Sequence, residues 1–287
     1  MVTRPSLKLA LVAPFEGRYR EVGYEVIYAI RLAVREANES EGVAGYSVEL
    51  LSLDDGGDPA QAVVQARKVG TDPQVLAVIG HWLDDTTLAA APVFAEQGTP
   101  LLATTSSADL PDPVFRLWPA DAAIKTAAPE ALHCPDPCDS LEDLEWLFSQ
   151  TQLATDRPPL AGPPLWGQSQ FYRLAGPAAE GVFFVAPAPL PADSTDPGFA
   201  KRYRAISNGV EPGTFAVLAY DATRLLFDAV VRDVEANGKP SRAGVAAALA
   251  SADYAGLSGK ISFDSDRDWV EAKGWVYQWQ EGKVVKP

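Results

Sequence analysis

The sequence predicts an α/β fold built on doubly wound parallel sheets. Short runs rich in valine and leucine alternate along the chain with amphipathic helical patterns. The runs are apolar throughout, as in strands that are buried on both faces, and their alternation with helices is typical of βαβ units. Residues that favour helix starts stand where the helical patterns begin. Together these observations favour a parallel sheet with helices on both faces.

The elements follow in a regular order. Strands are expected at "LKLALVA", "VELLSLDD", "VLAVIG" and "PLLAT", and helices over residues 25–36, 59–69 and 87–95. Asp58 precedes Pro59, which is the order expected of an N-cap residue followed by proline in the first helical turn. The chain then becomes rich in proline and irregular up to about Pro197. A helix at "YDATRLLFDAVVRDVEANG" and closing strands in "GKISFDSDRDWVEAKGWVYQWQEGKVV" follow.

Polar, aromatic and glycine residues gather in the turns that follow the strands. These turns are "APFEGRYREVGY", "DDGGD", "GHWLDD" and "ATTSSADLPD". In an open parallel sheet the carboxyl ends of the strands meet at one edge, and ligands bind outside that edge. The turns therefore predict a ligand site, although ordinary solvated loops would have a similar composition.

Charge and hydropathy limit the possible partners. With 24 Lys and Arg against 38 Asp and Glu, the 287-residue chain has a net charge of −14 and repels nucleic acids and anionic membrane surfaces. No apolar run reaches the roughly 20 residues that a membrane span needs. The segment "MVTRPSLKLALVAP" enters a strand pattern too early for a signal peptide. We therefore expect either a cytoplasmic protein or one whose leader has been removed.

The sequence holds little material for catalysis. His81 and His133 are the two histidines, and the nucleophile, zinc and nucleotide motifs GxSxG, HExxH, Walker A and GxGxxG are absent. Cys134 and Cys138, close to His133, are a weak metal motif, and a short-loop disulfide or two plain thiols is favoured. We expect no enzyme activity, no cofactor and no metal.

An ordered series of motifs over nearly the whole chain resembles a known family. The motifs are "LALVAPFEGRYREVGYEVIYAIRLAVREAN", "VELLSLDDGGDPAQAVVQARKV", "VLAVIGHWLDDTTLAAAPVFAEQGTPLLATTSS", "VFRLWPADAA", "FYRLAGPAAEGVFF", "LAYDATRLLFDAV" and "GLSGKISFDSD". They resemble the type I periplasmic solute-binding proteins of the branched-chain amino acid and amide class, the receptors of ABC transporters. The resemblance implies two α/β lobes that close over a solute. Lobe 1 would hold residues 1–118 and 197–266, and lobe 2 residues 119–196 and 267–287. On the order of 60 residues, two strand–helix units, would be missing from lobe 2.

The resemblance also implies binding residues in the first lobe. Relatives commonly carry small hydroxyl residues after the third strand, where this chain has Asp84 and Asp85. We expect one of these acids to cap the next helix and the other to face the solute, which would favour an ammonium, amide or hydroxyl group. Trp82 is expected to stack on the ligand or, alternatively, to pack within the lobe.

Further candidates come from other loops. Arg18 and Tyr19 could recognise a carboxylate, Arg18 by a bidentate contact. Thr104, Thr105 and Ser106 match the family position that binds the ligand head group. On the second lobe, "GPPLWG" makes Trp166 a candidate to cover the ligand. Asp221 in "AYDA" is a further ligand candidate, at a family position that is more often structural.

These residues predict a monomeric solute receptor that binds an amino acid, an amide or a similar small polar molecule. Its partner would be the membrane permease of an ABC transporter. It would be periplasmic or extracellular and held at the membrane through a leader that this chain lacks. A ligand- or partner-binding sensor domain without a transport function is the alternative, and a nucleotide enzyme on a similar sheet is a third possibility.

Overall fold

The structure is a computed structural model of the chain. Its described residues are 4–104, 110–120, 123, 126–134, 144–153 and 158–287. Thr105, Ser106 and Cys138, which the sequence analysis singled out, lie outside them.

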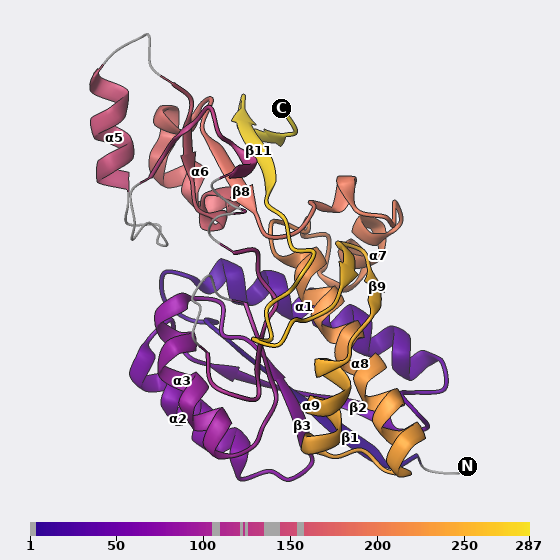
Figure 1. Cartoon of the computed structure of the whole chain (residues 1–287). Coiled ribbons are helices and arrows are strands. Elements are labelled where there is room, and N and C mark those ends of the chain that lie inside the picture. The colour runs from indigo at the N-terminus through magenta and orange to yellow at the C-terminus, as the bar shows by residue number, and fades with distance from the viewer. Residues whose placement is uncertain (1–3, 105–109, 121–122, 124–125, 135–143, 154–157) are drawn as a thin grey trace.

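A parallel sheet, sheet A, forms the centre of the larger of two lobes (Figure 1). Its described strands run in the order β2-β1-β3-β4-β5, and every neighbouring pair is parallel. The strands and the helices between them are β1 (Ser6–Ala13), α1 (Arg20–Glu39), β2 (Ser47–Asp54), α2 (Pro59–Gly70), β3 (Val75–Ile79), α3 (Asp84–Glu96), β4 (Leu101–Ala103) and β5 (Val114–Arg116).

Helices cover both faces of sheet A. On β1, Leu9 and Leu11 belong to a core cluster shared with α1 and α8, whereas Ala10 and Val12 belong to a second cluster with α2 and α3. Successive side chains of a strand point to opposite faces, so the two clusters lie on opposite sides of the sheet. The predicted doubly wound parallel sheet is confirmed, and so is the N-cap at Asp58, whose side chain accepts a hydrogen bond from the Gln61 amide.

After β8 the chain returns to the larger lobe and adds helices and a hairpin to it. These elements are α7 (Phe199–Ile206), α8 (Ala216–Asn237), α9 (Arg242–Ala250) and the hairpin of β9 (Tyr254–Gly256) and β10 (Gly259–Ile261). The residue patterns predicted α1, α2, α3 and α8, but neither α7 nor α9, and of the four predicted helices only α2 begins where expected. The structure begins α1, α3 and α8 three to five residues before the predicted positions.

A second sheet, sheet C, forms the smaller lobe. Its described strands run in the order β12-β11-β8-β7-β6, with β6, β7 and β8 parallel and β11 and β12 antiparallel. Its elements are β6 (Leu132–His133), α5 (Leu144–Leu153), β7 (Leu160–Gly162), the 3-10 helices η1 (Pro164–Gly167) and η2 (Gly176–Ala179), α6 (Ser169–Ala175), β8 (Phe183–Ala186), β11 (Trp275–Gln280) and β12 (Lys283–Val285). A third 3-10 helix, η3 (Pro191–Asp193), follows β8 on the way to α7.

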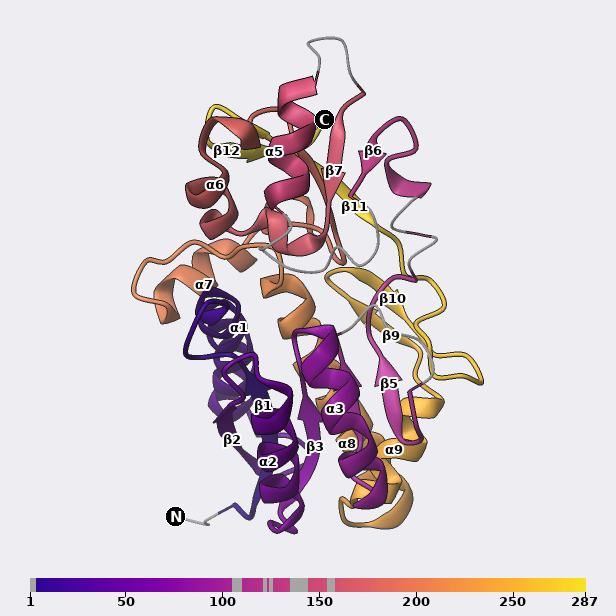
Figure 2. The ribbon, with the colours of Figure 1, turned by 90° about the vertical axis from the view of Figure 1, so that its left-hand side faces the viewer.

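The chain passes between the lobes after β5, after β8 and before β11, as Figures 1 and 2 show. The C-terminal strands β11 and β12 belong to sheet C. The exact lobe boundaries stay a prediction. None of the described helices is long and apolar enough to span a bilayer.

Candidate functional site

The strand order fixes where a ligand would bind on sheet A. From β1 the chain continues to β2 on one side and then crosses to β3 on the other, so the order reverses between β1 and β3. Open α/β sheets bind ligands in the crevice outside the carboxyl ends of the strands at this reversal. The loops after β1 and β3 hold Arg18, Tyr19 and Trp82, and this edge of sheet A points toward the smaller lobe (Figure 2).

Two glycines let these loops approach one another. Gly80 ends β3 with φ +134°, and a Cβ there would collide with the carbonyl oxygen of Val12 on β1. Gly57, in the loop after β2 with φ +72°, would place a Cβ 3.1 Å from the Tyr19 ring and 3.2 Å from Leu83. The loops after β1, β2 and β3 therefore pack against each other at this edge.

Two adjacent carboxylates join the same loops by hydrogen bonds. Asp54 accepts from the Phe15 amide at 2.7 Å, and Asp55 accepts from Nδ1 of His81 at 2.6 Å and from the Gly57 amide at 2.9 Å. The side chains of Asp55 and His81 are both fully buried. This Asp55–His81 contact is not predicted from the sequence, although "DD" and "GH" each stand at the carboxyl end of a strand.

Thr104 belongs to this network. Its buried hydroxyl donates to the His81 carbonyl at 2.6 Å, which links the loop after β4 to the loop after β3. The position of Thr104 is thus fixed by a protein partner. Thr105 and Ser106 follow it outside the described residues.

Trp82 is buried rather than displayed on the loop surface. It is 3% exposed, and its ring lies 5.9 Å from that of Phe215, which also stacks with Trp118 at 6.1 Å. This is the packing alternative that the sequence left open. The indole N–H groups of Trp82 and Trp118 have no hydrogen-bond partner among the described residues.

Asp84 and Asp85 open helix α3. Leu83 is at the N-cap position and makes no side-chain capping bond, so neither acid occupies that position. Asp84 is half-buried and Asp85 is exposed. Their charges lie in the first turn, where negative groups interact favourably with the helix dipole and leave less positive potential for a ligand anion.

The remaining first-loop candidates are accessible. Arg18 is exposed and Tyr19 is half-buried in the turn that leads into α1. Together with Asp84 and Asp85 they are the predicted residues that the structure brings to the surface of this edge.

Trp166 and Asp221 are held inside the protein. Trp166 is fully buried in the smaller lobe, where it stacks on Phe171 at 4.7 Å. Asp221 on α8 is 1% exposed and accepts hydrogen bonds from the amides of Leu257 and Ser258 at 2.8 and 2.7 Å and from the Ser258 hydroxyl. Burial raises the pKa of Asp221 to about 6. Its partners anchor the β9–β10 hairpin to α8.

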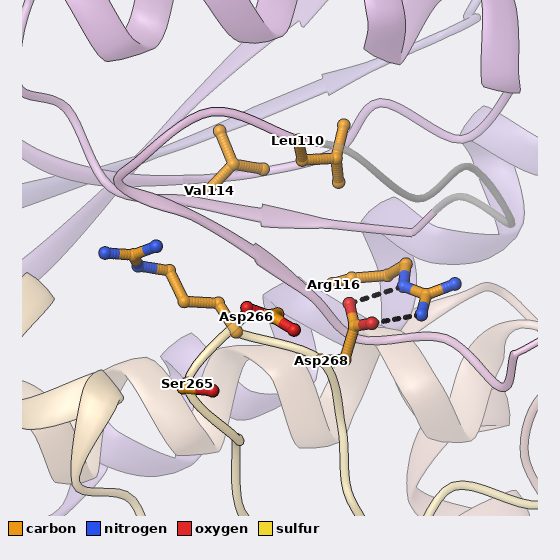
Figure 3. A pocket seen from close by; sticks show the side chains of 7 residues that line it. Leu110, Val114, Arg116, Ser265, Asp266 and Asp268 are labelled. Atoms are coloured by element: carbon orange, nitrogen blue, oxygen red, sulfur yellow. Dashed lines mark hydrogen bonds and ion pairs between the residues drawn. The ribbon is translucent and has the colours of Figure 1, made fainter.

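A separate hollow of about 280 Å³ lies at the outer strand β5 (Figure 3). Figure 3 shows Arg116 and Asp268 facing each other in a two-point ion pair, with 2.7 Å between Arg116 Nε and Asp268 Oδ1. Arg267 pairs with Asp112 at 2.8 Å. These pairs attach the loop before β11 to β5, away from the reversal between β1 and β3.

Possible metal ligands among the described residues are His, Cys, Asp and Glu side chains. No group of three or more His, Cys, Asp or Glu side chains is placed there to hold a metal ion. Cys134 is disulfide-bonded, which agrees with one of the two arrangements favoured from the sequence.

Comparisons of the sequence with family models and with curated proteins indicate the same family. The model of the periplasmic binding protein family matches residues 6–128 and 151–283. The leucine-, isoleucine-, valine-, threonine- and alanine-binding protein of Pseudomonas aeruginosa is 24% identical over 345 residues, which cover 96% of this chain and 90% of that protein. The Leu/Ile/Val-binding protein of Escherichia coli is 30% identical over 112 residues, or 39% of this chain and 30% of that protein.

Solved structures share the fold. The branched-chain amino acid transporter substrate-binding protein of Streptococcus pneumoniae in complex with isoleucine has a TM-score of 0.80 at 20% identity, covering 98% of this chain and 100% of that one. A solute-binding protein of R. palustris in complex with benzoate has a TM-score of 0.76 at 20% identity, covering 98% and 95%. The family match is interrupted at residues 129–150. The expected loss of two strand–helix units just before this stretch stays a prediction.

Proposed function

The chain belongs to the periplasmic binding protein family, and from that premise we propose that it is the solute receptor of an ABC transporter. Members of this family are receptors rather than enzymes, and the Pseudomonas aeruginosa and Escherichia coli relatives bind branched-chain amino acids, the former also threonine and alanine. The ligand of this chain would be an amino acid, an amide or a similar small polar molecule. It would be held between the carboxyl edge of sheet A and the smaller lobe.

The observation that carries this proposal is the arrangement of loops at the reversal between β1 and β3. Their backbones are fixed by Asp54, Asp55 and His81, and their accessible side chains point away from the lobe core. Such a preformed polar edge suits a ligand that is recognised by a few placed hydrogen bonds.

We propose Arg18, Tyr19, Asp84 and Asp85 as ligand contacts, with Thr105 and Ser106 as further predicted ones. The acids favour an ammonium, amide or hydroxyl group near α3, and Arg18 offers a partner for a carboxylate. Thr104, Trp82, Trp166 and Asp221 would act through the positions of these groups, because their side chains are buried against protein partners.

A thermal-shift screen tests the proposal. The probes are L-leucine, L-isoleucine, L-valine, L-threonine, L-alanine, their amides and benzoate. A ligand that binds only the native state stabilises it by about 2.7 kcal/mol at 100 times its Kd, so binding raises the melting temperature. A rise with at least one amino acid or amide, repeated by isothermal titration, is expected. No response to any probe would refute the proposed ligand class.

The proposal extends to partner and location. The receptor would deliver its solute as a monomer to a membrane permease from the periplasm or the cell exterior. A sensor domain that binds a ligand or a partner protein is the second candidate, favoured by the interrupted family match in the smaller lobe. Reconstitution with a permease encoded beside it, followed by solute uptake, separates the two, since a sensor would not support uptake.

A further inference from the structure

Two carboxylates on α1 bind the smaller lobe. Glu21 accepts hydrogen bonds from the Ser169 hydroxyl at 3.1 Å and the Gln170 amide at 3.2 Å, and it forms an ion pair with Arg173. One turn later, Glu25 accepts from Nε2 of Gln168 at 2.9 Å. Because α1 starts directly after the loop that holds Arg18 and Tyr19, these contacts join the lobes beside the candidate site.

Glu25 is also tied to the larger lobe. Its carboxylate accepts from the Phe215 amide at 2.6 Å, and its backbone carbonyl accepts from the Tyr203 hydroxyl at 2.9 Å. The ring of Phe215 packs against the rings of Trp82 and Trp118. Glu25 thus connects the smaller lobe, through Gln168, to the aromatic cluster under the candidate site.

The surroundings of Glu25 make its ionised form costly. The residue is 7% exposed, and no lysine, arginine or histidine of the described chain forms an ion pair with it. A buried carboxylate without a cation is destabilised when charged, even where neutral donors bind it.

The titratable groups around Glu25 do not offset this cost. On α1 they are Glu21, one turn earlier, and Tyr28, one turn later; α7 adds Tyr203, and the smaller lobe adds Arg173, which is paired with Glu21. The start of α8 presents backbone N–H groups. Burial raises the pKa of Glu25 from 4.5 to about 7, although the Gln168 amide and the backbone N–H groups act to lower it.

We propose that Glu21 and Glu25 form a latch that holds the two lobes together, and that Glu25 takes up a proton when the lobes close. Separation of the lobes removes Gln168 and admits water to the Glu25 carboxylate. The proton is then released, so a rising pH favours the open form. Glu21 and Arg173 add an ion pair at the surface, which contributes little free energy.

The size of the effect follows from linkage. If opening returns the pKa of Glu25 to its ordinary value, the ratio of closed to open molecules changes by at most about tenfold per pH unit. The ratio changes between pH 4.5 and about pH 7, the two pKa values of Glu25, and it levels off above this range. Between about pH 5 and pH 8 the closed form should lose on the order of 50- to 100-fold relative to the open form.

The experiment measures lobe opening directly, by small-angle scattering from the full chain without added solute between about pH 5 and pH 8.5. It does not require the ligand to be known, so its failure is distinct from failure of the proposed function. The wild-type radius of gyration should increase with pH, with the change complete slightly above pH 7. Glu25→Gln, which imitates the protonated side chain, should stay compact throughout.

Matched controls separate the latch from general effects of charge. Glu36 lies on the same helix, and its carboxylate binds Arg202 and Tyr220 within the larger lobe. The radius of gyration of Glu36→Gln should therefore change with pH as in the wild type. Gln168→Ala removes the hydrogen bond of the smaller lobe to Glu25 and leaves the Phe215 contact intact, so it should shift the lobes toward the open form even at the acidic end. If circular dichroism shows that Glu25→Gln does not fold, the scattering result of Gln168→Ala tests the latch on its own. A wild-type dimension independent of pH, or a compact Gln168→Ala, would overturn the proposal.

Discussion

Replacing Asp55 with alanine should test how the loops at the candidate site are held. The substitution removes the acceptor for His81 Nδ1 at 2.6 Å and for the Gly57 amide at 2.9 Å. Both side chains of the Asp55–His81 pair are fully buried, so water cannot replace the lost acceptor without entering the packed edge. An unsatisfied buried donor costs about 1–3 kcal/mol. Two donors at this edge, His81 Nδ1 and the Gly57 amide, lose their acceptor together, so the two costs add to about 3–5 kcal/mol.

We therefore expect Asp55→Ala to lower the free energy of unfolding by about 3–5 kcal/mol. Asp55→Asn is the matched control. The asparagine oxygen can still accept from the Gly57 amide, and its NH₂ group can donate to His81 Nδ1 when that nitrogen carries no proton. Its cost should stay near 1 kcal/mol, the usual net value of a hydrogen bond.

Urea denaturation followed by circular dichroism measures both values, since the midpoint shifts in proportion to the change in stability when the slope is constant. Two results would contradict this expectation: an alanine variant that loses less than about 1 kcal/mol, or an asparagine variant that loses as much as the alanine variant. Either result would mean that the Asp55–His81 contact does not hold the loops together.

Three further predictions concern other parts of the same framework. Asp221→Ala should lower the free energy of unfolding by about 3 kcal/mol and increase hydrogen exchange in the β9–β10 hairpin, because the amides of Leu257 and Ser258 lose their acceptor; unchanged exchange would contradict this role. Stability should fall between about pH 5 and pH 8, because burial raises the folded-state pKa of Asp221 to about 6 and of Glu25 to about 7, above their ordinary values of 3.8 and 4.5. That contribution is fully present below the ordinary pKa values and is lost as the pH rises through about 6 to 7, so urea midpoints that rise over this range would refute it. Arg18→Ala should weaken binding of a responding amino acid by tenfold or more while sparing its amide, with Arg20→Ala, exposed at the start of α1, as the control; equal losses for acid and amide would exclude a carboxylate contact.

The parts of the fold that could be predicted are those that depend on local pattern. Apolar runs of strand length identify β1 to β4 of sheet A but not β5, and Asp58 before Pro59 marks a helix start, because each signal lies within a few residues. The start of α3 was harder to predict. Aspartate favours both the N-cap and the first turn, and in the structure Leu83 takes the cap and leaves both acids inside the helix.

The candidate site could be predicted only in part, because its contacts join distant segments. Asp55 and His81 are 26 positions apart, and Glu25 and Gln168 are 143 apart. No pattern in a single segment shows such a pair. The burial of Trp82 and Trp166 has the same origin, since it depends on Phe215 and Phe171 from other elements.

The contacts at the candidate site divide into two kinds with different consequences. Asp54, Asp55 and His81 bind loops of the larger lobe to one another, so the shape of that edge does not depend on the smaller lobe. Glu21 and Glu25 bind one lobe to the other, so they respond to any movement between the lobes. Substitutions in the first group should change which solutes fit, because they move the groups that contact the ligand. Substitutions in the second group should change the affinity for all solutes by a similar factor, because they alter the fraction of molecules in the closed form.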